Sequence, residues 1–299
     1  MKMSLLSLSA GIAIVWGATA LADDQKIQPL SEVHSAKSMM SHEVRNSANE
    51  KLGKIEDLAI DKDGQCRFLI VGVGGIVNSD KFIAIPCSAV KPDHQNKQCT
   101  LEMSKTNFEA APSYTREQYY SAWPKEWRTK VNEHFGVKSE LTKEETKSDS
   151  TAQAEQDKNR TTSDDSTLFY ATKLLGANLR NRNNDTLTSI DDLAMNGKGC
   201  VKYAIVGHGG VLKIGENKIA VPWKAMDLTL GEKGTVMASI DMTGKQLEGA
   251  PVLKQENMAD LMSESYVQSS NRFFGVTERK EVEAKTPAER DRQRKDQDR

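Results

Sequence analysis

Two pairs of acidic residues are the side chains whose type and spacing could do chemistry. Glu56-Asp57 and Asp191-Asp192 stand at the same position in two similar stretches of the chain. Paired carboxylates can serve as general acid and general base for one substrate. Both pairs fall in stretches that read as β-strands, where neighbouring side chains point to opposite faces. We therefore expect the acids to be solvated or to stabilise a turn, and we assign no catalytic residues.

The glycine pairs Gly74-Gly75 and Gly209-Gly210 could suggest a phosphate-binding loop. Such a loop places glycine between a strand and the N-terminus of a helix. Here each pair lies between two predicted strands, and glycine is the usual residue where a turn needs positive φ. These four glycines are therefore expected to form turns, and no cofactor is predicted.

Histidine and serine give no support for a metal site or a nucleophile. The serines lack the Gly-x-Ser-x-Gly context of a nucleophile elbow. The histidines are scattered and fall at no metal-ligand spacing, so no metal is predicted; they are His34, His42, His94, His134 and His208.

Four cysteines leave the disulfide pairing open. If residues 82–87 pair antiparallel with residues 99–103, Cys87 and Cys99 lie almost opposite each other on the inward face. The hairpin through Gly74-Gly75 makes Cys66–Cys87 the alternative pair. Cys200 then has no partner in its own half of the chain and is expected to be a free or intermolecular thiol. No CxxC pair is present, which argues against zinc.

The elements that would position these residues occur twice. Residues 72–77 and 82–86 are repeated at 207–212 and 218–222, and the acids are repeated with their neighbours. A repeat of this length indicates two copies of one domain. In the first copy strands are expected at 54–60, 66–73, 82–86 and 100–103, with a hairpin turn at 61–64. In the second copy they are expected at 189–195, 201–206, 218–222 and 236–242. Several short strands with tight turns suit a small β-barrel.

Residues 207–223 resemble the core signature of the PRC-barrel family, with Gly209-Gly210 before the strand and Ala220-Val221-Pro222-Trp223 at its end. The first copy is similar but has Cys87 where the second has Trp223. The family is named for the reaction-centre H subunit and also occurs in a ribosome maturation factor. Exported tandem copies in proteobacteria resemble this chain most. The resemblance implies a fold that is mainly β with short helices, made of two tandem small β-barrels that act as docking or scaffold modules.

A helix is expected after each barrel. Large side chains recur every four residues and end in Gly136 in the first copy and in Gly275 in the second. This spacing puts them on one side of a helix, and the glycine fits a C-cap. The first helix gathers the aromatic residues Tyr119, Tyr120, Trp123 and Trp127. They could form a binding platform, but we expect them to pack on their own barrel.

The chain divides into five predicted segments. Residues 1–22 read as a secretory signal peptide, residues 36–136 as the first repeat with its helix, and residues 167–276 as the second. Residues 137–166 are polar and are predicted to be a disordered linker between two separately folding units. Residues 277–299 form a charged tail. The mature protein is then expected in the periplasm, without a transmembrane span.

Charge excludes one class of partner. The net charge is −1, with 28% charged residues of both signs, so no basic face points to nucleic acid. The leading hypothesis is therefore an exported, non-enzymatic binding or scaffold protein whose partner is a protein or an envelope component. The alternative is a small-ligand-binding protein or a hydrolase with a site between the barrels.

Overall fold

A computed structural model describes residues 32–73, 81–115, 118, 124–137, 167–208, 217–231, 234–254 and 258–276. All of these described ranges belong to one compact unit. The predicted signal peptide and charged tail lie outside the described residues, as does the predicted linker except for Val137. The described helices are all too short or too polar to cross a membrane.

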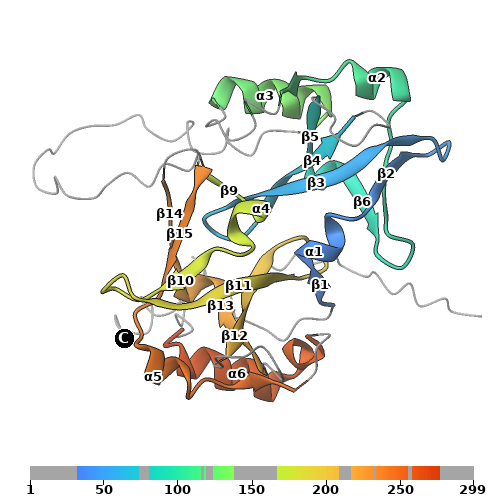
Figure 1. The fold of residues 1–299 in the computed structure, drawn as a ribbon. Helices are drawn as coiled ribbons and strands as arrows, with labels where there is room; N and C mark the ends of the chain where they lie inside the picture. The colour runs from blue at the N-terminus through green and yellow to red at the C-terminus, as the bar shows by residue number, and fades with distance from the viewer. Residues whose placement is uncertain are drawn as a thin grey trace, which may run out of the picture. The chain divides into compact units, whose positions relative to one another are not determined.

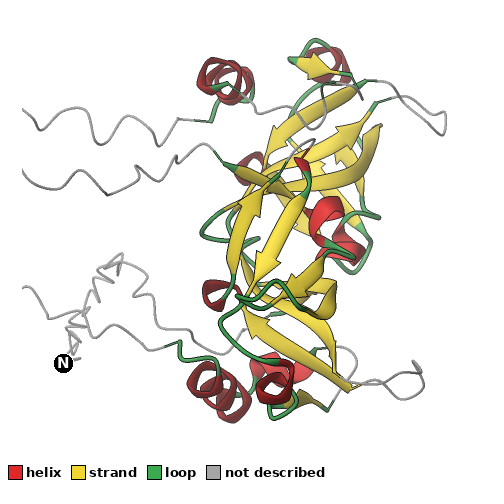
Figure 2. Ribbon diagram, turned by 60° about the vertical axis from the view of Figure 1, so that its left-hand side comes forward, coloured by secondary structure: helices red, strands yellow, loops and turns green. Residues whose placement is uncertain are grey.

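The described strands form two eight-stranded sheets, each built mainly from one repeat. The helices that connect the strands are short (Figure 2). The first sheet runs in the order β6-β7-β2-β3-β4-β5-β8, with β9 added on β3. Its strands are β2 (Glu43–Asn46), β3 (Lys51–Asp61), β4 (Cys66–Gly72), β5 (Phe82–Pro86), β6 (Val90–Asp93), β7 (Gln98–Leu101), β8 (Ser113–Tyr114) and β9 (Leu168–Tyr170).

The second sheet has the same order, β14-β15-β10-β11-β12-β13-β16, with β1 added on β11. Its strands are β1 (His34–Ser35), β10 (Asn178–Arg180), β11 (Thr186–Met195), β12 (Val201–His208), β13 (Asn217–Pro222), β14 (Asp227–Leu230), β15 (Val236–Ser239) and β16 (Val252–Leu253). The prediction of a mainly β protein built from two copies is confirmed. In each sheet, hydrogen bonds between the described strands give an open order and do not join its first strand to its last.

The central strands form where the sequence predicted them. β4 is apolar at almost every position because both of its faces are covered: Leu69 and Val71 enter one core cluster, and Phe68 and Ile70 enter another. The predicted turn at 61–64 closes the β3–β4 hairpin with Gly64 at φ +85°. The strand order differs after β5, because the β6–β7 hairpin pairs with β2 rather than continuing the meander.

The helices are short. They are α1 (Ala36–Met39), α2 (Lys105–Glu109), α3 (Lys125–His134), α4 (Ala171–Leu174), α5 (Gly244–Leu247) and α6 (Glu264–Phe273), with the 3-10 turns η1 (Cys87–Ala89), η3 (Trp223–Ala225) and η5 (Ala259–Met262). α3 and α6 are the helices predicted after the barrels, and both end before a glycine with positive φ, Gly136 and Gly275. Pro124 stands at the N-cap of α3.

The two repeats exchange their leading segments. β1 and α1 stand at the start of the first repeat in the chain, yet β1 pairs with β11 of the second. β9 and α4 stand at the start of the second repeat, yet β9 pairs with β3 of the first. Figure 1 shows both exchanged segments beside their host strands. The exchange was not foreseen, and it places both repeats in one compact unit where the sequence suggested separate folding.

The main core continues from one repeat into the other. Buried side chains of both repeats belong to one cluster, with Ile55 and Leu58 from the first and Ile190 and Leu193 from the second. A smaller cluster lies between the other face of the first sheet and α3, where Val131 is fully buried. Burial of apolar surface contributes about 25 cal/mol per Å² to stability. A core shared by both repeats therefore stabilises their association.

The exchange yields a prediction about cleaved protein. We expect the two halves to remain bound to each other after cleavage at a protease site inserted between residues 138 and 166, because each half supplies a strand and a helix to the other. Size-exclusion chromatography of the cleaved protein should give one peak that contains both fragments. Separate elution of the fragments under native conditions would contradict the exchange.

Candidate functional site at the junction of the repeats

The acids Asp57 and Asp192 hold the exchanged segments. The Asp57 carboxylate accepts hydrogen bonds from the backbone N–H of Thr172, at 2.9 Å, and from the Thr172 hydroxyl in α4. In the other repeat, Asp192 accepts from the backbone N–H of Lys37, at 3.2 Å, and from the Ser35 hydroxyl, at 2.5 Å. Asp57 is fully buried and Asp192 is half-buried. Both therefore anchor a short helix of the opposite repeat, and for Asp57 the expected solvated position is wrong.

Their neighbours Glu56 and Asp191 lie one strand position away and do not share this role. Asp191 instead accepts a hydrogen bond at 2.8 Å from the Lys218 ammonium on β13 of its own sheet. Asp191 and Asp192 thus have separate partners. The strand register shifts between Ile55 and Asp57 and between Ile190 and Asp192, so Glu56 and Asp191 lie at β-bulges. The structure does not bring a Glu-Asp or Asp-Asp pair together on one substrate-sized site.

The two β-hairpin turns of the repeats meet at equivalent positions. Gln65 and Cys200 form an isolated antiparallel bridge. The Cys66 N–H donates to the Gly199 carbonyl at 3.1 Å, and the Val201 N–H donates to the Gly64 carbonyl at 2.7 Å. Because these bonds join equivalent residues of the two copies, the contact is reciprocal.

The side chains at this junction are not reciprocal: Trp223 of the second repeat packs on the turn of the first repeat, and the first repeat has no equivalent tryptophan. The Trp223 indole N–H donates to the Lys62 carbonyl in the turn of the first repeat at 2.9 Å, and the residue is 3% exposed. A Cβ added to Gly64 would lie 2.5 Å from the Val201 carbonyl oxygen and 3.0 Å from the Trp223 ring. Gly64 therefore has to be glycine for its close approach as well as for its backbone angle.

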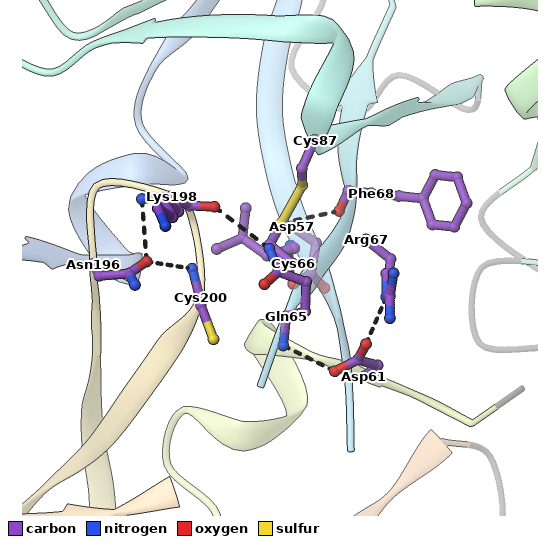
Figure 3. The surroundings of a disulfide bond; sticks show 11 residues. Asp57, Asp61, Gln65, Cys66, Arg67, Phe68, Cys87, Asn196, Lys198 and Cys200 are labelled. Carbon is purple, nitrogen blue, oxygen red and sulfur yellow. Dashed lines mark hydrogen bonds and ion pairs between the residues drawn. A yellow bond between two sulfur atoms is a disulfide. The ribbon is translucent and has the colours of Figure 1, made fainter. Parts of the chain in front are cut away.

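On the other side of the junction, the residue equivalent to Trp223 is Cys87, and it forms a disulfide with Cys66 (Figure 3). Their Cα atoms are 6.2 Å apart, within the range of about 4.4–6.8 Å that a disulfide needs. The preferred sequence pairing, Cys87 with Cys99, is corrected by this bond. Cys99 lies opposite Pro92 and Val44 because β7 pairs with β6 and β2, whereas Cys87 follows β5, the partner of β4.

The other two cysteines are free and buried. Burial raises the pKa of the Cys99 thiol to about 11 and also raises the pKa of the Cys200 thiol. Both therefore stay protonated near neutral pH, and a protonated thiol is a poor nucleophile. Cys200 is free, as predicted, and its burial argues against the intermolecular bond that the sequence left open.

Three histidines that the sequence left scattered come together beside the disulfide. The rings of His34 on β1 and His94 after β6 are stacked, with centroids 3.5 Å apart. His42 contacts His94 edge-on at 5.3 Å and is fully buried. Among the described residues, no set of three or more His, Cys, Asp or Glu side chains is arranged to hold a metal ion. The sequence contains no spacing that predicts this cluster, because its members come from three segments. The exchange of β1 brings these segments together.

A cavity of about 210 Å³ opens between the histidines and the disulfide. Apolar side chains and the disulfide form much of its wall, and the turn of the second repeat, residues 196–199, closes one side. The lining residues are His34, Met39, Cys66, Leu69, Cys87, Val90, Pro92, His94, Met195, Asn196, Gly197, Lys198 and Gly199.

The histidine cluster predicts acid sensitivity. Burial and the neighbouring imidazoles lower the pKa of His94 to about 4, and burial lowers the pKa of His42. Between pH 6.5 and 4 the unfolded chain therefore binds more protons, so stability is fully present above pH 6.5 and is lost as the pH falls towards 4. The groups around the cluster are Glu32 and Asp93, which favour protonation, and Lys97, which opposes it. Allowing for partial solvent screening, we expect a loss of about 1–2 kcal/mol.

Urea unfolding at a series of pH values tests this expectation. His94→Gln should flatten the dependence between pH 6.5 and 4, whereas the control His134→Gln, on α3, should leave it unchanged. An equal pH dependence in wild-type protein and His94→Gln would show that the cluster is not its source.

The structure describes only part of the predicted aromatic platform and none of the turn glycines. Trp127 packs against the smaller core, edge-on to Tyr114 at 5.7 Å between ring centroids. This is the packing role that we expected for the stripe. Tyr119, Tyr120 and Trp123 lie outside the described residues, as do Gly74, Gly75, Gly209 and Gly210.

Comparison with known families agrees with the repeated fold. Residues 32–96 and 166–241 each match the family model of the PRC-barrel domain. The protein contains two tandem PRC-barrel domains. Both matches begin at the exchanged segments, so each PRC-barrel match includes the strand and short helix that pack on the other repeat. No curated protein sequence matches the chain.

Proposed function

We propose that this protein is an exported, non-enzymatic binding or scaffold protein that uses its PRC-barrel modules to contact a protein of the cell envelope. The observation that carries the proposal is the edge strand β14 of the second barrel. Described residues pair with β14 on one side only, through β15. The free side of such a strand offers unpaired N–H and C=O groups to an extended segment of another chain.

The two barrels differ at this edge. In the first barrel the edge strand β6 contains Pro92, and the exposed ammonium of Lys91 forms an ion pair with Glu102 at 2.5 Å. Proline and lysine are the residues that commonly protect an edge from pairing. β14 has neither, and its sequence is Asp-Leu-Thr-Leu. The second barrel therefore presents the edge that is suited to adding a strand.

Apolar side chains beside this edge suit a protein partner. Leu230 on β14 is 41% exposed, and Met237 on β15 is 55% exposed. The Gly231 N–H bonds to the Thr235 carbonyl at the hairpin end, so antiparallel alternation turns the peptide groups of Leu228 and Leu230 towards the free edge. An extended apolar segment would gain both backbone hydrogen bonds and contacts with these side chains.

Two further observations support the proposed compartment and class. The Cys66–Cys87 disulfide is a bond that persists in oxidising compartments, which favours export. The resemblance to docking modules of the PRC-barrel family favours binding over catalysis. The hydrolase alternative gains no supporting site among the described residues, whereas the junction cavity gives the small-ligand alternative a location.

Photo-cross-linking in intact cells tests the proposed edge. A cross-linkable amino acid at Met237 should give a discrete adduct with an envelope protein, and the same probe at Lys91 on the protected edge should give none. Leu230→Pro removes an edge N–H and should abolish the adduct, whereas Leu230→Thr keeps the N–H and should retain it. An adduct that survives Leu230→Pro, or no adduct at Met237, would contradict strand addition at β14.

A further inference from the structure

The two sides of the junction are built from equivalent residues but are filled differently. On one side the Trp223 indole lies against the turn at Lys62–Gly64. On the other side the equivalent residue is Cys87, whose small side chain is bonded to Cys66, and both cysteines line the cavity. The cavity of about 210 Å³ is lined by Cys87 and by the equivalent turn residues Gly197 and Gly199. The cavity therefore lies where a copy of Trp223 would be.

The residue equivalent to the polar partner of the indole also lines the cavity. Trp223 donates its N–H to the Lys62 carbonyl. The residue equivalent to Lys62 in the second repeat is Gly197, which lines the cavity. Asn196 holds this turn by accepting hydrogen bonds from the N–H groups of Lys198, at 3.1 Å, and Cys200, at 2.9 Å. The turn around Gly197 is thus fixed by its own hydrogen bonds before any ligand arrives.

Size and wall chemistry favour a flat aromatic molecule. An apolar cavity of about 150 Å³ is large enough to bind benzene, so about 210 Å³ has room for a larger ring system. Met39, Leu69 and Met195 supply apolar and polarisable contacts, and methionine sulfur packs well on aromatic rings. The rings of His34 and His94 add a flat wall. Burial keeps His94 neutral near pH 7, because its pKa is lowered to about 4.

We propose that the junction cavity is a binding site for a planar aromatic ring that carries an N–H or O–H donor, with indole as the type, and that the donor bonds to the Gly197 carbonyl. The ring would occupy the place that Trp223 takes on the opposite side. The proposal does not depend on strand addition at β14, so each can fail without the other. The ring can come from a free molecule or from a tryptophan side chain of a partner.

Calorimetry on the full mature protein with indole is the direct test. Wild-type protein should bind indole at one site. Benzothiophene has the same shape without the N–H and should bind about two- to ten-fold more weakly, which is the usual worth of one hydrogen bond. Binding of N-acetyl-tryptophanamide as tight as that of indole assigns the site to a partner's side chain, and binding of indole alone assigns it to a free molecule. Absence of indole binding to folded wild-type protein overturns the proposal.

A double substitution places a tryptophan in the junction cavity, as on the opposite side of the junction. Cys66→Val with Cys87→Trp installs the residues found at positions 201 and 223 and should abolish indole binding. The control Cys66→Ala with Cys87→Ala removes the disulfide but leaves the cavity open, and it should still bind indole. Unchanged indole binding by the Val/Trp variant would contradict the site.

A measurement on wild-type protein keeps the test independent of how these variants fold. Indole should shift the amide NMR signals of Gly197 and Gly199, which line the cavity. The amides of Gly136 and Gly176, which are not among the lining residues, serve as references and should not shift. Shifts that leave Gly197 and Gly199 unchanged would place the ligand elsewhere and overturn the assignment.

Discussion

Asp57→Ala should destabilise the protein by about 3 kcal/mol. The Asp57 carboxylate is fully buried and accepts hydrogen bonds from the backbone N–H groups of Leu58, at 2.7 Å, and Thr172, at 2.9 Å, and from the Thr172 hydroxyl. Its removal leaves the N–H of the buried residue Leu58, and the two Thr172 donors of the exchanged helix α4, without their acceptor. Each hydrogen bond to a charged group is worth about 1.5–3 kcal/mol. Urea unfolding followed by circular dichroism measures the change.

The equivalent residue in the other repeat provides a matched control. Asp192 accepts from Ser35 and Lys37 in the same arrangement but is only half-buried. Asp192→Ala should therefore cost about 1 kcal/mol, because water can replace the lost acceptor. Equal losses in the two variants would show that burial does not separate them. A negligible loss for Asp57→Ala would show that the α4 contact is not a structural link.

Removal of the Cys66–Cys87 disulfide should cost about 3 kcal/mol. The bond closes a loop between residues separated by 21 positions, and a cross-link of this span restricts the unfolded chain by about that amount. Denaturant midpoints of wild-type protein with and without a reductant measure the loss. Cys66→Ala with Cys87→Ala should match the reduced wild-type protein and should not respond to the reductant.

Peptide mapping can determine directly which cysteines are paired. Non-reducing peptide mapping should recover Cys66 linked to Cys87, with Cys99 and Cys200 as free thiols that react only after unfolding. Their burial and raised pKa values both slow labelling of the folded protein. A Cys87–Cys99 linkage in the oxidised protein would contradict the register in which β7 pairs with β6 and β2.

Local sequence patterns predicted the elements well because their causes are local. Residues 61–64 carried a turn signal and form the β3–β4 turn. The apolar run at 66–73 predicted a strand covered on both faces, and β4 has core clusters on both sides. The stripes ending at Gly136 and Gly275 predicted α3 and α6 with glycine caps. The edge strand β6 was missed because Pro92 argues against a strand interior and is accepted only at an edge.

The sequence by itself determined that this protein is a duplicated, mainly β chain, because a repeat and an alternation of apolar residues can be read along the chain. The PRC-barrel family was indicated separately, by the resemblance of residues 207–223 to its signature. The tertiary structure alone decided how the copies join. Exchange of β1 and β9, burial of Asp57 against α4 and the gathering of His34, His42 and His94 all link residues far apart in sequence. It also decided the disulfide, since a pairing depends on which strands are neighbours. Such contacts depend on which segment packs on the other copy and on side chains buried between the copies. Neither produces a repeated pattern of residues that could be recognised in the sequence.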